Sequence, residues 1–133
     1  MGWDVGVRSN LQKILDGHAA SLVRAHALGV LIVAGSDAGS VGVAHGHGLL
    51  RELELMERAG LPSLAVLHAA TGAGSGRFGY KEKFGLIRPG YLSRLILTRH
   101  SPLETVANLR KPRTVIFDGA VFATDEDPEV GNL

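Results

Sequence analysis

A chain of 133 residues has room for about one domain, and 45% hydrophobic with 20% charged residues is the composition of an ordinary globular protein. The formal net charge is +1 and the basic residues form no block, which argues against a nucleic-acid or membrane partner. Cysteine is absent, which excludes disulfides and thiolate metal sites.

The first predicted element is a helix followed by a buried strand. Ser9 and Gln12 have the spacing of a capping box, and Gly29 is placed to end the helix in a left-handed turn. Residues 30–34 then form an unbroken apolar run that is too short for a helix. Such a run is typical of a strand buried on both faces, as in a parallel sheet flanked by helices.

A glycine-rich loop and two further helices are predicted next. The loop spans residues 35–48. The second helix starts at residue 49 and ends at Gly60, and the third is short and opens at Pro62. The core-facing stripe predicted for the second helix consists of Leu49, Leu53 and Met56.

Past residue 80 the pattern becomes β-rich. Pro89-Gly90 is a turn signal before a strand at residues 92–98, and Asp118-Gly119 between two apolar triplets predicts a hairpin. Ser101 and Glu104 fit a second capping box, so a short helix is expected up to about residue 109. The predicted division is an α/β part at residues 1–80, strands and a hairpin at residues 81–125, and a frayed acidic tail at residues 126–133.

Asp37 is the first candidate for chemistry. A carboxylate at the C-terminal end of a parallel strand lies where α/β folds and barrels place their reactive groups. The glycines around Asp37 let backbone and ligands approach closely. The alternative is that Asp37 organises the turn or caps the next helix, and position and composition leave both interpretations open.

Three other patterns resemble known kinds of site. His45-Gly46-His47 has the spacing of a metal-binding pair, but a glycine loop holds ligands poorly. Residues 74–79 fit G-x-G-x-x-G, but the dinucleotide motif needs a strand before it and a helix after it, and the opposite order is predicted here. His68 lies on the third predicted helix, where we expect a packed or half-exposed side chain without a catalytic role.

The order of the motifs is more specific than any one of them. "VAGSDAG", five residues, "HG", "LLRELELMERAGL", "AVLHAAT", "FGLIRPG", "LSRLILT", "SPLETVANLR" and "VIFDGAVF" follow one another from residue 33 to residue 122. This order resembles the C-terminal end of the metal-dependent amidohydrolase superfamily, in the branch of imidazolonepropionase-like and Xaa-Pro dipeptidase-like enzymes. The resemblance covers nearly the whole chain.

The resemblance implies an α/β fold in which a partial TIM-type barrel, its last β/α unit with flanking helices, precedes the C-terminal strands of a small β-sandwich. It places Asp37 on the aspartate that ligates a divalent metal, usually zinc, and that carries a proton from the attacking water to the leaving nitrogen. A metal lowers the pKa of bound water, and a carboxylate beside it can shuttle the proton. His45 matches a histidine near the substrate pocket.

The sequence departs from the family pattern in several places. Ser93-Arg94-Leu95 replaces Ala-Asp-Leu, Ala73 stands where asparagine is usual, and Leu61 replaces the threonine before Pro62. The other metal ligands of the family, a His-x-His pair, a lysine and two later histidines, lie upstream of the aspartate, and 36 residues precede Asp37 here. Because a complete barrel takes about 250 residues, we expect a C-terminal fragment.

Two hypotheses of function follow. The first is the C-terminal piece of an amidohydrolase that hydrolyses an amide or cyclic amide C–N bond in a small molecule with metal-activated water, inactive by itself. The second is a non-catalytic chain of the same ancestry that self-associates or completes a partner chain. The absence of a signal-peptide pattern and of a membrane-length apolar run predicts a cytoplasmic protein. The substrate cannot be read, because specificity in such barrels lies in other loops.

Overall fold

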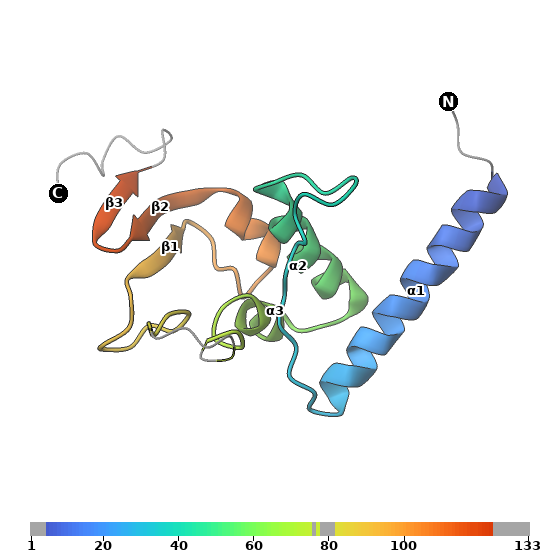
Figure 1. Ribbon diagram of the computed structural model, residues 1–133, viewed down its shortest axis with the longest axis horizontal. Helices are drawn as coiled ribbons and strands as arrows, with labels where there is room; N and C mark the ends of the chain where they lie inside the picture. Colours follow the sequence, from blue (N-terminus) through green and yellow to red (C-terminus); the bar gives the residue numbers. More distant parts are fainter. Residues whose placement is uncertain (1–4, 76, 78–81, 124–133) are drawn as a thin grey trace.

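The computed structural model describes residues 5–75, 77 and 82–123 and shows an α/β fold (Figure 1). The elements are α1 (Val5–Ala27), α2 (His47–Ala59), α3 (Ser63–Ala70), β1 (Arg94–Thr98), the 3₁₀ helix η1 (Val106–Arg110), β2 (Pro112–Phe117) and β3 (Ala120–Ala123). The acidic tail at 126–133 and part of the G-x-G-x-x-G match at 74–79 lie outside the described residues. Of the described helices, none is long and apolar enough to cross a membrane.

Helix α1 starts earlier than its sequence signals indicate. Ser9 lies in its second turn, so the predicted capping box is wrong. A serine cap contributes about 1 kcal/mol, and the added backbone hydrogen bonds of a longer helix outweigh it. The predicted end is confirmed: Gly29 has a φ of 74°, and the N–H groups of Gly29 and Val30 donate to the carbonyls of His26 and Ala25 at 3.0 Å.

Residues 30–34 do not form a strand in this structure, so the prediction of a strand buried on both faces is wrong. Exposure alternates across residues 31–38 with the period of two that extended backbone produces. The Ala34 N–H donates to the Ala69 carbonyl of α3 at 2.9 Å, but among the described residues no strand pairs with the segment. Its side chains therefore stay exposed, at 54% for Val30, 45% for Leu31 and 41% for Val33.

The core lies between α2, α3 and η1. Its buried members are Leu53, Met56, Leu61, Val66, Ala69 and Val106. Gly60 ends α2 with a φ of 112°, and the Leu61 N–H donates to the Met56 carbonyl, which turns Leu61 back into the core. The predicted core-facing stripe of α2 is confirmed for Leu53 and Met56, whereas Leu49 is 38% exposed.

A three-stranded antiparallel sheet, in the order β1-β2-β3, follows the helices. The predicted hairpin is confirmed, because Asp118 and Gly119 have φ values of 49° and 91°, as a type I′ turn requires. The first strand begins at Arg94, two residues later than residue 92, where the sequence predicts it. Apolar side chains remain more than half exposed on the sheet: Ile96, Phe117, Val121 and Phe122.

The second predicted capping box is also wrong. Residues 102–104 form a turn, and the short helix is η1, whose N-cap is Thr105. The Thr105 hydroxyl accepts from the Ala107 N–H at 3.3 Å. Glu57 of α2 explains the displaced start, since Thr105 Oγ1 and the Val106 N–H both donate to its carboxylate, at 2.8 and 3.0 Å.

Glu57 thereby connects three elements of the fold. Its carboxylate also accepts from Ser63 Oγ, at the start of α3, at 2.7 Å. Burial raises the pKa of the Glu57 carboxyl, but the three hydrogen bonds together outweigh burial and hold this pKa below its usual value. The donors keep a carboxylate ionised near the C-terminal end of α2, where the helix dipole disfavours negative charge.

We expect Glu57→Ala to lower the free energy of unfolding by about 2–3 kcal/mol, because three buried or half-buried donors lose a charged acceptor. Urea denaturation followed by circular dichroism measures the change. Glu52→Ala, on the same helix, is the matched control and should cost less than about 0.5 kcal/mol. Equal effects of the two substitutions would show that the Glu57 hydrogen bonds do not stabilise the fold.

The same network predicts a loss of stability in acid. Because the folded-state pKa of Glu57 lies below its usual 4.5, the stabilisation is complete above pH 4.5 and disappears as the pH falls through the lower folded value. Urea midpoints of the wild type should fall below pH 4.5 more steeply than those of Glu57→Gln. Parallel pH curves for the two proteins would contradict this.

Candidate functional site

Asp37 lies in the loop between residues 30–34 and α2, as the sequence predicts, and its side chain is exposed. Its φ of 47° is left-handed, a conformation that aspartate tolerates better than most residues. Ser40 Oγ donates to Asp37 Oδ2 at 2.7 Å, and the Ser40 N–H donates to the Asp37 carbonyl at 3.2 Å. The carboxylate is therefore held on one oxygen by a side chain of its own loop.

His45 lies against the same loop. A Cβ built on Gly39, whose φ is 103°, would lie 3.6 Å from His45 Nε2. A side chain at Gly39 would thus contact the His45 imidazole and would strain the backbone. The structure brings the loop backbone beside Asp37 and the His45 ring together. His47 is the first residue of α2, and both histidine side chains are exposed.

The described residues do not fit a complete divalent metal site. Catalytic zinc takes three protein ligands and a water. Nowhere in the part of the chain that the structure describes do three His, Cys, Asp or Glu side chains gather as a ligand set. Asp37 is available as one ligand, and His45 and His47 do not form a set with it. His68, on α3, is exposed.

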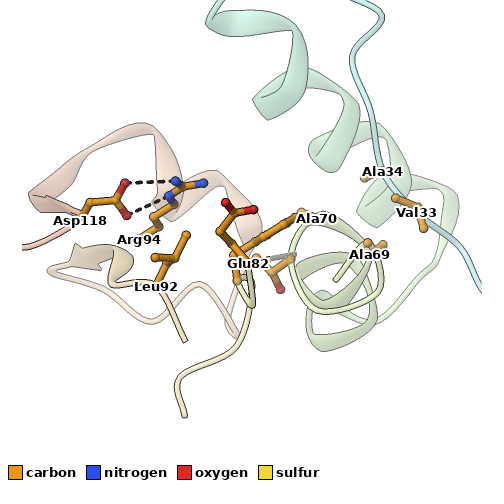
Figure 2. Close-up of a pocket in the computed structure, with 11 residues that line it drawn as sticks. Val33, Ala34, Ala69, Ala70, Glu82, Leu92, Arg94 and Asp118 are labelled. Carbon is orange, nitrogen blue, oxygen red and sulfur yellow. Dashed lines mark hydrogen bonds and ion pairs between the residues drawn. The ribbon is translucent and has the colours of Figure 1, made fainter. Parts of the chain in front are cut away.

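A pocket of about 680 Å³ lies between the helical part and the sheet, away from Asp37 and His45. Figure 2 shows Val33, Ala34 and Ala69 on one side of it, and Arg94 and Asp118 on the other. Val33 and Ala34 belong to the segment 30–34, with which no strand pairs among the described residues. The pocket is open to solvent, and alanine side chains form part of its wall.

Arg94 and Asp118 form an ion pair at the sheet side of this pocket. Arg94 Nε and Nη2 donate to the two Asp118 carboxylate oxygens at 3.0 Å each (Figure 2). The Arg94 guanidinium also lies 4.9 Å from the Phe117 ring centroid. The hydrogen bonds from Arg94 hold the pKa of the Asp118 carboxyl below its usual value. Arg94 stands where the resembled family has aspartate, so the departure at residues 93–95 is matched here by an acidic partner in the hairpin turn.

Comparison with known proteins identifies the relatives. The sequence model of the family described as "Amidohydrolase family" matches residues 7–121. The crystal structure of a Xaa-Pro dipeptidase with methionine bound in its active site is similar at 27% identity and a TM-score of 0.68, over 80% of this chain and 25% of the dipeptidase. A crystal structure of an amidohydrolase matches at 22% identity and a TM-score of 0.44, over 67% of this chain and 29% of that one. Among curated proteins none matches.

We expect the chain, purified alone, to contain no stoichiometric zinc, because one carboxylate cannot hold a divalent ion against solvent and buffer. Inductively coupled plasma mass spectrometry after gel filtration measures the metal content. One zinc per chain that is retained in Asp37→Asn and lost in the double variant His45→Ala, His47→Ala would assign the site to the two histidines and remove Asp37 from it.

Proposed function

Because the chain belongs to the amidohydrolase family, we propose that it is the C-terminal part of a metal-dependent amidohydrolase that hydrolyses a C–N bond once the rest of the barrel is present. The observation that carries this proposal is the match over residues 7–121, which spans the Asp37 loop and the hairpin. The chain spans about a quarter of the dipeptidase, at 25%. Alone it is proposed to be inactive.

Asp37 is the proposed catalytic residue and metal ligand of this chain. When bound, a divalent metal, zinc in this proposal, acidifies the attacking water. Asp37 accepts the proton of that water and returns it to the leaving nitrogen, a transfer that needs an exposed carboxylate with a free lone pair. The loop position and the exposure of Asp37 support this role. His45, beside the same loop, is proposed to contact substrate.

The proposed architecture assigns residues 1–80 to the last unit of a TIM-type barrel and residues 81–125 to sandwich strands. Residues 30–34 support the first part: exposure alternates from residue 31 onward as in a strand, yet no strand among the described residues pairs with this segment. The exposed Ile96, Phe117 and Phe122 support the second part, because a sheet with a bare apolar face is stable when another layer covers it.

The proposed substrates are small amides, either a dipeptide or a cyclic amide. The dipeptide class is suggested by the Xaa-Pro dipeptidase, which this chain resembles at 27% identity and a TM-score of 0.68. Hydrolysis of a Xaa-Pro bond and opening of a cyclic amide both need water activated beside a carboxylate. The loops that would separate these substrates lie elsewhere in such barrels.

The second candidate is a non-catalytic chain that associates with copies of itself. A specific observation favours it: the N-terminal half of α1 exposes an apolar set, and Figure 1 shows this half extending away from the rest of the fold. The set consists of Val7, Leu11, Ile14 and Leu15, each more than 40% exposed. Such a face invites a partner helix.

We expect activity to appear when the chain is co-expressed with the part of the Xaa-Pro dipeptidase barrel that it does not cover. Hydrolysis of a Xaa-Pro dipeptide, followed by proline release, measures it. Asp37→Asn should lower kcat at least about a thousandfold, because asparagine keeps the shape but cannot accept the proton.

Asp16→Asn, the same change on the exposed face of α1, is the matched control and should leave kcat unaltered. If an assembled complex with Asp37→Asn hydrolyses the dipeptide as well as the wild type does, Asp37 has no catalytic role. A well-assembled complex without activity on a dipeptide or on a cyclic amide would favour the non-catalytic candidate.

We also expect the chain alone to self-associate at tens of micromolar, since unpaired strand edges and bare apolar faces pair with one another at about this order of concentration. Light scattering coupled to gel filtration measures the molar mass. A stable, folded monomer of 14.0 kDa under these conditions would contradict the proposed need for a partner.

A further inference from the structure

Among the described side chains, that of Ser40 donates a hydrogen bond to the Asp37 carboxylate. Its hydroxyl donates to Asp37 Oδ2 at 2.7 Å, a short and therefore strong contact for a charged acceptor. A serine hydroxyl carries a single proton, so it occupies one lone pair of one carboxylate oxygen. The bond thus gives the two oxygens of Asp37 different surroundings.

The loop holds the Ser40 backbone in place on both sides. The Ser40 N–H donates to the Asp37 carbonyl at 3.2 Å, and the Ser40 carbonyl accepts from the Val43 N–H at 3.0 Å. The Gly39 N–H donates to the Val43 carbonyl at 3.3 Å and closes the turn. These bonds fix the position of the Ser40 Cα atom, so that one χ1 rotamer of Ser40 places its hydroxyl on Asp37 Oδ2.

The neighbouring residue, Val41, does not hold the turn by packing. The Val41 side chain is fully exposed, at 106% of its reference area. Gly48 has no room for a Cβ, which would lie 2.9 Å from Val43 Cγ1 and 3.1 Å from Ser36 Cβ. Backbone hydrogen bonds and the close approach of Gly48 to Val43 and Ser36 therefore hold the shape of the loop.

We propose that Ser40 is a positioning residue for Asp37, and that its hydroxyl holds the carboxylate in one rotamer with Oδ1 left for the reaction. This inference rests on the proposed function of Asp37. An Asp37 side chain that rotates freely would present its reactive oxygen for only part of the time. A residue that acts only by orienting Asp37 affects the chemical step and not substrate binding, so the loss would appear in kcat with KM unchanged.

The first arm of the test uses the chain as it is and needs no activity. Three-bond couplings between the α and β protons of Asp37 report whether its χ1 angle occupies one rotamer or several. One rotamer is expected in the wild type and in Ser40→Thr, which keeps the hydroxyl, and averaging is expected in Ser40→Ala. Val41→Ala is the matched control and should retain one rotamer.

Amide shifts of the loop separate positioning from loss of structure. In Ser40→Ala, the amides beyond residues 36–44 should keep their wild-type shifts while the Asp37 couplings change. A wild-type Asp37 that already averages between rotamers, or a Ser40→Ala protein that retains one rotamer, would overturn the proposal.

The second arm measures activity in the complex with the complementary barrel part. Ser40→Ala should lower kcat about tenfold with KM unchanged, and Ser40→Thr should restore most of it. An unchanged kcat in Ser40→Ala within an active complex would overturn the positioning role alone. A complex that is inactive with every variant would count against the proposed function, and the couplings would still decide the inference about Ser40.

Discussion

The arrangement of this chain depends on one carboxylate, Glu57, at the end of α2. The carboxylate oxygens of Glu57 accept hydrogen bonds from the start of α3 and from the start of η1, which lies 48 or more residues away in sequence. Without these bonds α2 would carry an unpaired acid at the negative end of its dipole, beside the buried Val106. Arg110 of η1 reinforces the junction through Glu54, one turn earlier on α2. The segment between the helical part and the sheet is anchored here, so the position of the sheet also depends on Glu57.

The features that could be predicted from sequence are the helix ends and the hairpin turn, where the backbone conformation depends on the residue type at that position. Gly29, Gly60 and the Asp118-Gly119 pair adopt positive φ because the chain needs it and these residues permit it. The two capping boxes failed because Ser-x-x-Gln and Ser-x-x-Glu spacings have small energies. Longer helical hydrogen bonding displaced the first, and the distant Glu57 displaced the second.

The candidate site also contains features with a local sequence signal and features that depend on the fold. Asp37 could be picked out because its place after an apolar run and among glycines is visible in sequence, whereas His45 was named only because it matches a histidine of the resembled family. The Ser40 hydrogen bond has a local signal, a hydroxyl three residues after an aspartate, that is too common to be specific. Arg94 with Asp118 and Glu57 with Thr105 join residues far apart in sequence, so they needed the fold. Residues 30–34 were predicted as a paired strand from their apolar pattern. The prediction was wrong because pairing depends on neighbouring strands, which the sequence of one segment does not reveal.

The most direct measurement of the central proposal, that residues 30–34 pair as a barrel strand once the rest of the barrel is present, is backbone hydrogen exchange. Val66, at 0% exposed and with its N–H bonded to the Pro62 carbonyl, serves as a protected internal reference. In the chain alone, the amides of residues 31–33 should exchange far faster than that of Val66, whereas Val30 and Ala34 already donate to the carbonyls of Ala25 and Ala69. After addition of the complementary part of an amidohydrolase barrel, the amides of residues 31–33 should become as slow as that reference. Amides of these residues that are already protected in monomeric chain, or that stay fast in a stable complex, would contradict the proposal.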